Sequence, residues 1–249
     1  MSRTAKQLGY GTFYLAIIAF VAVSVFSGWE QEGEVSVPVP EGVRSLEVRE
    51  AVAFMTAADG SVALLGRVWN PNTMYAASAF PYAFRIMRGD TVILETPRRA
   101  GFAYPLESGT FLETVLAETF IPTTSRIRDG EAIGTENTKV VLDIGAPTWV
   151  SAEFLVRPTL TALRVETFSD EFGAFIEGEV RNVGAVLATT ARIIAIIEDM
   201  NGFPLFAAQT LLENIPGGTF RPFFIRFPRD RRLAERVAPN GTELIIEAQ

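Results

Sequence analysis

The stretch that decides the fold occurs twice in this chain: residues 64–71 read Leu-Leu-Gly-Arg-Val-Trp-Asn-Pro, and residues 175–183 read Phe-Ile-Glu-Gly-Glu-Val-Arg-Asn-Val. Three residues of the first stretch return in the second at one constant offset: Gly66, Val68 and Asn70 as Gly178, Val180 and Asn182. Further on, Ser-Gly-Thr-Phe at 108–111 matches Gly-Gly-Thr-Phe at 217–220, at an offset three residues shorter. Such self-similarity indicates a tandem duplication with its boundary near Val156–Pro158.

Both copies show the patterning of β-strands. Residues 80–86 place Phe, Tyr, Phe and Ile at every second position, a period typical of strands with one buried face. Ile194 and Ile196 are expected to take these positions in the second copy, within an almost continuous apolar run that predicts a strand covered on both faces. Short strands separated by frequent turn residues are typical of a β-sandwich. We therefore predict an all-β fold with two tandem sandwiches, at 44–156 and 157–249, and a loop or short helix at 123–137 and at 230–237.

The second copy resembles the FxLYD and LEA14-like group of small immunoglobulin-like β-sandwich domains. The resemblance rests on three segments: Ile176-x-Gly178-x-Val180-x-Asn182, Asp199-Met-Asn-Gly202 and Pro216-Gly-Gly-Thr-Phe220. Ile196 and Ile197 replace the Leu-Tyr pair that names FxLYD, and the first copy lacks the Pro-Gly turn. The resemblance implies an immunoglobulin-like fold and a role as a tethered binding or structural module. It implies no catalytic activity.

The repeated glycines and asparagines have structural interpretations. Gly66 and Gly178 are expected to mark a bulge or a tight contact within a sheet rather than a ligand site. Asn70 and Asn182 are expected to hydrogen-bond backbone groups at strand ends and to form Asx-turns.

The N-terminal segment is predicted to cross a membrane. No charged residue occurs between Lys6 and Glu30, and residues 9–29 supply the roughly 20 apolar residues that a membrane-spanning helix needs. Aromatic residues occupy the two ends of this segment, where they are expected to contact lipid headgroups as membrane anchors: Tyr10, Tyr14, Phe26 and Trp29. Membrane lipid is therefore one predicted partner.

The charges beside the segment predict its orientation. Arg3 and Lys6 precede it, whereas three glutamates follow within 30–34, so residues 1–8 are expected in the cytoplasm and the remainder outside. Residues 30–43, rich in Glu, Val and Pro, are expected to form an extended linker. A signal peptide cleaved before Gly28 is the alternative, and it exports the same residues. Twenty arginines against two lysines indicate a GC-rich bacterial coding background, so we expect the bacterial plasma membrane, with the sandwiches periplasmic or extracellular.

Composition narrows the possible chemistry. The chain contains no Cys and no His, which removes thiolate metal sites, the commonest general base and the commonest transition-metal ligand. All 29 acidic residues but only 20 of the 22 basic residues follow Trp29, and this acidic balance argues against nucleic acid as a partner. We expect a protein that is not an enzyme and that has no metal or cofactor.

One basic and aromatic segment stands out within the acidic part. We predict a partner-binding surface near the end of the second copy, formed by Arg221, Phe223, Phe224, Arg226, Arg229, Arg231 and Arg232. Arginines bind carboxylates through paired hydrogen bonds. Neighbouring strand residues point to opposite faces, so Phe223 and Phe224 cannot both enter one core. Two interpretations of the outward aromatic face stay open: packing on the first copy, or contact with a partner.

These features lead to an expected role. The chain is predicted to be a single-pass envelope protein whose tandem sandwiches bind or brace other envelope or membrane proteins, as a non-catalytic subunit of a membrane-associated assembly. The alternative is binding of a small apolar or lipidic ligand between the sheets or the sandwiches.

Overall fold

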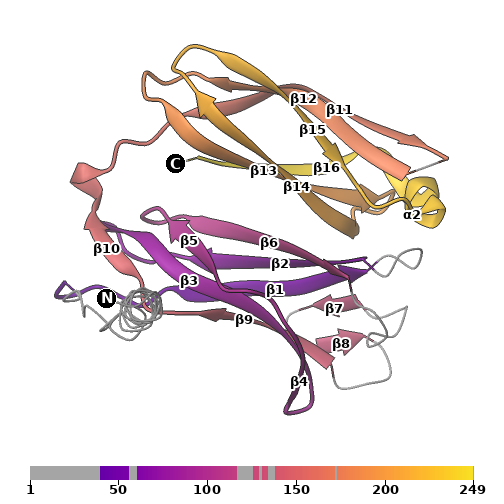
Figure 1. Cartoon of the computed structure of the whole chain (residues 1–249), viewed down its shortest axis with the longest axis horizontal. Helices are drawn as coiled ribbons and strands as arrows, with labels where there is room; N and C mark the ends of the chain where they lie inside the picture. Colours follow the sequence, from indigo (N-terminus) through magenta and orange to yellow (C-terminus); the bar gives the residue numbers. More distant parts are fainter. Residues whose placement is uncertain are drawn as a thin grey trace, which may run out of the picture. The chain divides into compact units, whose positions relative to one another are not determined.

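A computed structural model describes residues 40–55, 61–116, 126–128, 131–133, 138–171 and 173–248. The described chain is mostly β-strand, with almost no helix, which confirms the predicted all-β class (Figure 1). The predicted membrane segment at 9–29, its aromatic anchors Tyr10, Tyr14, Phe26 and Trp29, and all but the end of the 30–43 linker lie outside these residues. Among the residues described, no helix has the length and apolar character needed to cross a bilayer.

The first half of the chain forms two sheets. Sheet A has the strand order β6-β2-β1-β7-β8, and sheet B is built around β3, which pairs with the other four strands of that sheet. The strands of sheet A are β1 (Glu47–Met55), β2 (Ser61–Trp69), β6 (Ser108–Leu116), β7 (Arg126–Arg128) and β8 (Glu131–Ile133). Those of sheet B are β3 (Tyr75–Arg88), β4 (Thr91–Glu95), β5 (Arg99–Ala103), β9 (Thr138–Ile144) and β10 (Thr148–Ser151).

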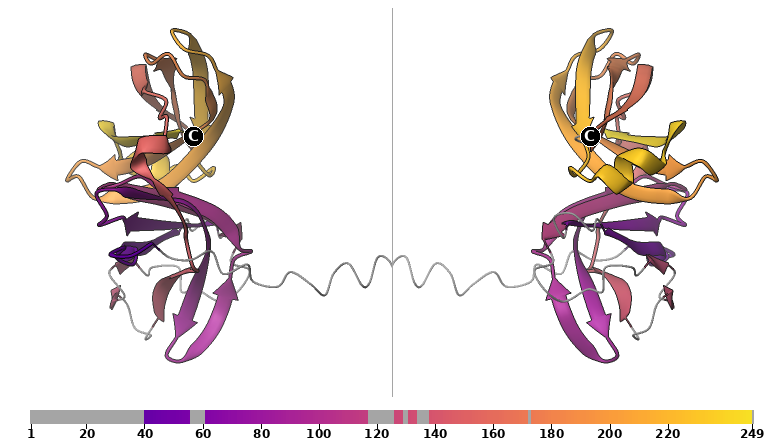
Figure 2. Two further views of the ribbon diagram at one scale, coloured as in Figure 1. Left: turned by 90° about the vertical axis from the view of Figure 1, so that its left-hand side faces the viewer. Right: turned by 90° about the vertical axis from the view of Figure 1, so that its right-hand side faces the viewer.

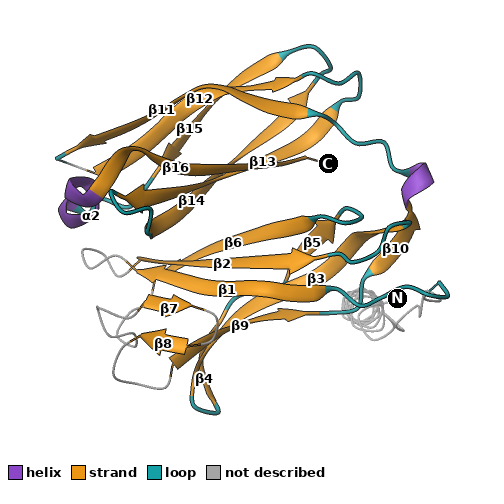
Figure 3. Ribbon diagram, turned by 180° about the vertical axis from the view of Figure 1, so that it is seen from behind, coloured by secondary structure: helices purple, strands orange, loops and turns teal. Residues whose placement is uncertain are grey.

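The second half forms two smaller sheets. Sheet C has the order β11-β12-β15, and sheet D has the order β14-β13-β16. Their strands are β11 (Leu160–Asp170), β12 (Gly173–Asn182), β13 (Ala188–Asp199), β14 (Pro204–Ile215), β15 (Phe220–Arg226) and β16 (Val237–Ala248). Two short helical segments complete the described chain: η1 (Ala152–Phe154) and α2 (Arg231–Arg236) (Figure 3). The helix α2 fulfils the expectation for 230–237, whereas β7 and β8 occupy part of 123–137, where a loop or helix was expected.

Each half buries its own apolar core between its two sheets. In the first half, Phe80, Phe84 and Ile86 of sheet B meet Leu64 and Phe111 of sheet A, and none of these five side chains is more than 1% exposed. In the second half, the sheet C side of the core contains Ile176, Val180, Phe223, Ile225 and Phe227. These paired sheets explain the period-2 pattern of residues 80–86, since every second side chain of β3 enters the core.

The register of the strands corrects one part of the predicted repeat. Gly66 pairs with Phe111 across β2 and β6, and Gly178 pairs with Phe223 across β12 and β15. Phe111 therefore corresponds to Phe223, not to Phe220, and the offset between the copies does not shorten here. The sequence match at 108–111 and 217–220 set the first residues of strand β6 against the turn that precedes β15.

The two repeated glycines allow close side-chain packing. A Cβ atom on Gly66 would lie 2.6 Å from the Leu142 Cδ2 atom and 3.0 Å from the Phe84 ring. A Cβ atom on Gly178 would lie 2.8 Å from the ring of Phe223. Both glycines thus leave room for core side chains, which confirms the tight contact expected from the sequence.

The two repeated asparagines fasten the strand ends in the same way. The side-chain oxygen of Asn182 accepts the Gly184 N–H at 3.1 Å, and its amide donates to the carbonyls of Val186 and Ile215. Asn70 accepts the Asn72 N–H at 3.0 Å and donates to the carbonyls of Tyr75 and Ala103. Both side chains are fully buried, and the Asx-turns predicted at these residues are confirmed.

Sheets A and D pack against each other, so the two halves share an interface (Figures 1 and 2). The face of sheet A that turns away from sheet B contributes five residues to the apolar cluster of the second half: Val52, Phe54, Ala63, Leu65 and Leu112. Hydrogen bonds join the same two sheets: Gln209 Nε2 donates to the Leu112 carbonyl at 3.0 Å, and Arg67 Nη2 donates to Glu243 Oε1 at 2.8 Å. Residues 39–249 consequently form one compact unit.

This interface explains the continuous apolar run of β13. Ile193 through Ile197 are all buried, which confirms the prediction that both faces of the strand are covered. Ile194 pairs with Gln209, and Ile196 pairs with Glu243; both partners bond to the first half. Ile194 and Ile196 therefore lie on the face toward sheet A, and their expected correspondence to the core positions of residues 80–86 is wrong.

Candidate functional site

A row of three phenylalanine rings lies on the outer face of sheet C, which is the face opposite its core. Phe168 and Phe175 are direct strand partners, and their rings stack with centroids 5.1 Å apart and an interplanar angle of 17°. The ring of Phe224, on the next strand, lies 5.4 Å from that of Phe175. One ring from each of three neighbouring strands thus forms a continuous apolar row, which we call the Phe row.

The alternation of β15 produces this arrangement. Phe223, Ile225 and Phe227 enter the core and are at most 4% exposed, whereas the side chain of Phe224 between them points outward and is 45% exposed. Packing between the halves uses sheet D and leaves this face of sheet C uncovered by the described chain. Of the two interpretations of the outward aromatic face, packing on the first copy is therefore excluded for Phe224.

Charged side chains border the Phe row on both sides. Arg226 pairs with Phe175 across the strands, and its guanidinium lies 5.7 Å from the centroid of the Phe224 ring. Glu177 pairs with both Phe224 and Glu166, so the two carboxylates are neighbours on this face. Within the described part of the chain, no ion pair involves Glu166, Glu177 or Arg226.

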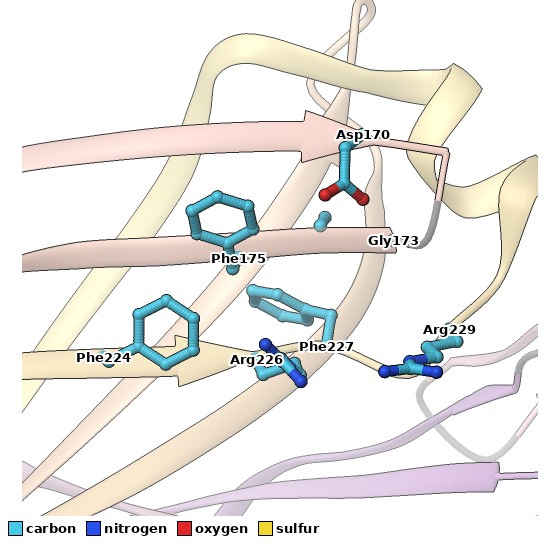
Figure 4. A pocket seen from close by; sticks show the side chains of 8 residues that line it. Asp170, Gly173, Phe175, Phe224, Arg226, Phe227 and Arg229 are labelled. Atoms are coloured by element: carbon cyan, nitrogen blue, oxygen red, sulfur yellow. The ribbon is translucent and has the colours of Figure 1, made fainter.

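Two hollows flank the row. One, of about 330 Å³, lies on the arginine side and is lined by Asp170, Phe175, Phe224, Arg226 and Arg229 among others (Figure 4). The other, of about 560 Å³, lies on the carboxylate side and is lined by Arg164, Glu166, Glu177, Glu179 and Phe224 among others. Phe224 therefore stands between a basic hollow and a largely acidic one.

The predicted surface residues are divided by the structure. Phe224, Arg226 and Arg229 meet at the basic hollow, and Arg221 is exposed at the start of β15. Phe223 is 4% exposed and packs over Gly178, so its predicted role on the surface is wrong.

The two remaining arginines of the predicted surface belong to α2. Arg231 donates to Glu235 one turn later, at 2.7 Å, and this local ion pair sets it apart from the Phe row. Arg232 lies in the same helix. Sequence reasoning missed Phe168, Phe175 and the two glutamates, because strand pairing alone brings them beside Phe224. The available signal was the alternation along β12, in which the buried Ile176 and Val180 imply that Phe175 and Glu177 point outward.

A buried carboxylate lies in the interface between the halves. Glu247 Oε1 accepts the backbone N–H of Thr110, while its Oε2 is buried without a hydrogen-bond partner among the described residues. Burial raises the pKa of Glu247 to about 7, against the opposing effects of the Thr110 N–H and the Arg192 guanidinium. Because Glu247 contacts a backbone amide of the other half, its titration bears on the interface rather than on a reaction.

No site with metal-binding character accompanies these features in the described residues: no group of three or more acidic side chains there could hold an ion. Comparison with known proteins adds no assignment, since no protein-family model matches the chain and no curated protein is significantly similar to it. The resemblance to the FxLYD and LEA14-like domains therefore rests on the turn motifs and strand pattern alone.

Proposed function

We propose that this protein is a single-pass membrane-anchored envelope protein whose tandem immunoglobulin-like β-sandwiches bind or brace partner proteins, as a non-catalytic subunit of a membrane-associated assembly. The N-terminal helix anchors it in the bacterial plasma membrane, and the two sandwiches lie on the outer side. The contact with partner proteins is made by the outer face of sheet C, through the Phe row and the charges beside it.

The exposed Phe row is the observation that carries this proposal. Burying an aromatic side chain in an interface stabilises the complex, and aromatic residues with arginine are enriched where proteins bind one another. Phe224 offers such a side chain on the outer face of sheet C, with an arginine beside its ring and, next to it, carboxylates that form no ion pair within the described chain. A face that only needed solvation would carry polar side chains in these places.

The compact packing of the two halves supports a bracing role. Two sandwiches that share an apolar cluster and several hydrogen bonds form one body, which holds the sheet C face at a fixed position relative to the first half. An interaction surface held in this way loses little conformational entropy when a partner binds.

A small apolar or lipidic ligand fits this surface less well. The hollow of about 560 Å³ beside Phe224 has the volume for such a ligand, but Glu166, Glu177 and Glu179 line it. An apolar ligand there would remove water from carboxylates without replacing their hydrogen bonds. A protein partner can supply cationic side chains for them.

Co-purification from native membranes in a mild detergent tests the proposal. We expect the full-length chain to retain partner proteins, and Phe224→Asp to lose them. Phe203→Asp is the matched control, because Phe203 is also about half exposed but lies in the turn between β13 and β14. Equal retention by the wild type and both variants would refute the role of sheet C, and lipid in place of protein in the purified sample would favour the ligand alternative.

A further inference from the structure

The outer face of sheet C has a counterpart in the first half, and there it is already covered. Phe54 pairs with Ala63 across β1 and β2, as Phe168 pairs with Phe175 across β11 and β12. The glycine register described above makes Leu112 the counterpart of Phe224. The positions of the Phe row in the second half are thus the positions that sheet A uses to pack on sheet D.

In the first half, the matching face of sheet A is covered by another β-sheet, sheet D. Phe54, Ala63 and Leu112 are buried because another sheet of this same chain lies over them. The second half keeps apolar rings at the same three positions although no described part of the chain covers them. Face-to-face packing of sheets is therefore the contact that this surface is suited to make.

The charges on the face restrict the arrangement further. The line through the three Phe rings divides the face, with Arg226 and Arg229 on one side and Glu166 and Glu177 on the other. All four charged residues are exposed, and none forms an ion pair within the described chain. A face with this pattern is complementary to itself.

We propose that the outer face of sheet C binds the same face of a second copy of this chain, about a two-fold axis that runs along the Phe row. Rotation about this axis places the rings of one copy on those of the other. It also places the arginine side of each copy over the glutamate side of its partner, so that Arg226 faces Glu177 twice. This isologous contact is the commonest form of dimer symmetry, and it deepens the proposed function by naming the partner of the surface.

A charge-swap experiment tests the symmetry: the charges at positions 226 and 177 are reversed, and capture of one tagged full-length chain by a differently tagged one is measured. We expect one tagged wild-type chain to capture the other from detergent extract, and Arg226→Glu or Glu177→Arg, each present in both chains, to reduce capture at least about tenfold. A mixture of one Arg226→Glu chain with one Glu177→Arg chain restores both contacts, so capture is expected to return to within about threefold of wild type. Restored capture also shows that both variants are folded.

Two outcomes would overturn the dimer. Capture that stays low in the mixture refutes the facing of Arg226 and Glu177, and wild-type chains that do not capture each other refute self-association altogether. Neither result decides the proposed function, since retention of other proteins that Phe224→Asp abolishes would still support it. Loss of both self-capture and partner retention in the wild type would contradict the two proposals together.

Discussion

Protonation of Glu247 is expected to make the stability of this protein depend on pH. Burial between the halves raises the pKa of this carboxyl from 4.5 to about 7 in the folded protein. The folded state therefore binds a proton that the unfolded state releases between these two values. Stability from this group is fully present below the lower value and is lost as the pH rises through the higher one. At about 1.4 kcal/mol for each pH unit, the loss amounts to roughly 3 kcal/mol.

Glu247→Gln isolates this contribution. The amide oxygen of Gln can still accept the Thr110 N–H, but the side chain no longer titrates. Urea unfolding of the full-length chain in detergent, followed by circular dichroism at pH 5 and pH 8, gives the free energy of unfolding of both proteins. We expect the variant to gain stability relative to the wild type by roughly 2.5 kcal/mol between the two pH values, because a small part of the loss already occurs below pH 5. Parallel pH dependences of the two proteins would refute the buried, protonated carboxyl.

Three further substitutions test the packing. Asn182→Ala removes three hydrogen bonds of a fully buried side chain and is expected to lower the free energy of unfolding by about 2–4 kcal/mol. The control Asn201→Ala, at an exposed side chain, is expected to change the free energy of unfolding little. Equal effects of the two substitutions would contradict the role of the Asx-turn. Gly217→Ala puts a Cβ atom 2.7 Å from a backbone oxygen and is expected to lower the free energy of unfolding by about 1–3 kcal/mol in the same measurement. The control Gly218→Asn is expected to be tolerated, because Gly218 has a positive φ and open space around it. An unchanged stability of Gly217→Ala would refute the close approach. Leu112→Ala is expected to cost about 2–5 kcal/mol and to separate the melting of the halves, as seen by calorimetry; an unchanged single transition would contradict the shared cluster.

Local chemistry made part of the fold predictable. Gly178 contacts a side chain on the adjoining strand, and Asn182 hydrogen-bonds a backbone group two residues later. Both interactions are local, so the sequence pattern around these residues predicted a close contact and a turn. The duplication was visible for the same reason. Register was not predictable in this way, because matching Phe111 to Phe220 aligned the beginning of strand β6 with the turn that precedes β15.

The limits of the site prediction follow from strand pairing. Phe224 was recognisable as an outward residue because it alternates with Phe223 in one strand, but Phe168 joins it only through two strand pairs. The face taken by Ile194 could not be read from a run in which every residue is apolar, since such a run has no period. Which face of β13 meets the first half depends on the packing of sheets A and D, and that packing joins residues more than 80 positions apart.

Photo-crosslinking from position 224 in native membranes tests most directly the claim that sheet C carries the interaction surface. A benzoylphenylalanine in place of Phe224 keeps an aromatic ring in the Phe row, and the same residue at Phe203 is the control of similar exposure. We expect protein crosslinks from position 224 and none of comparable yield from position 203, with peptides of β11, β12 or β15 from a second copy among the products. Crosslinks to lipid alone, or equal yields from the two positions, would contradict the account.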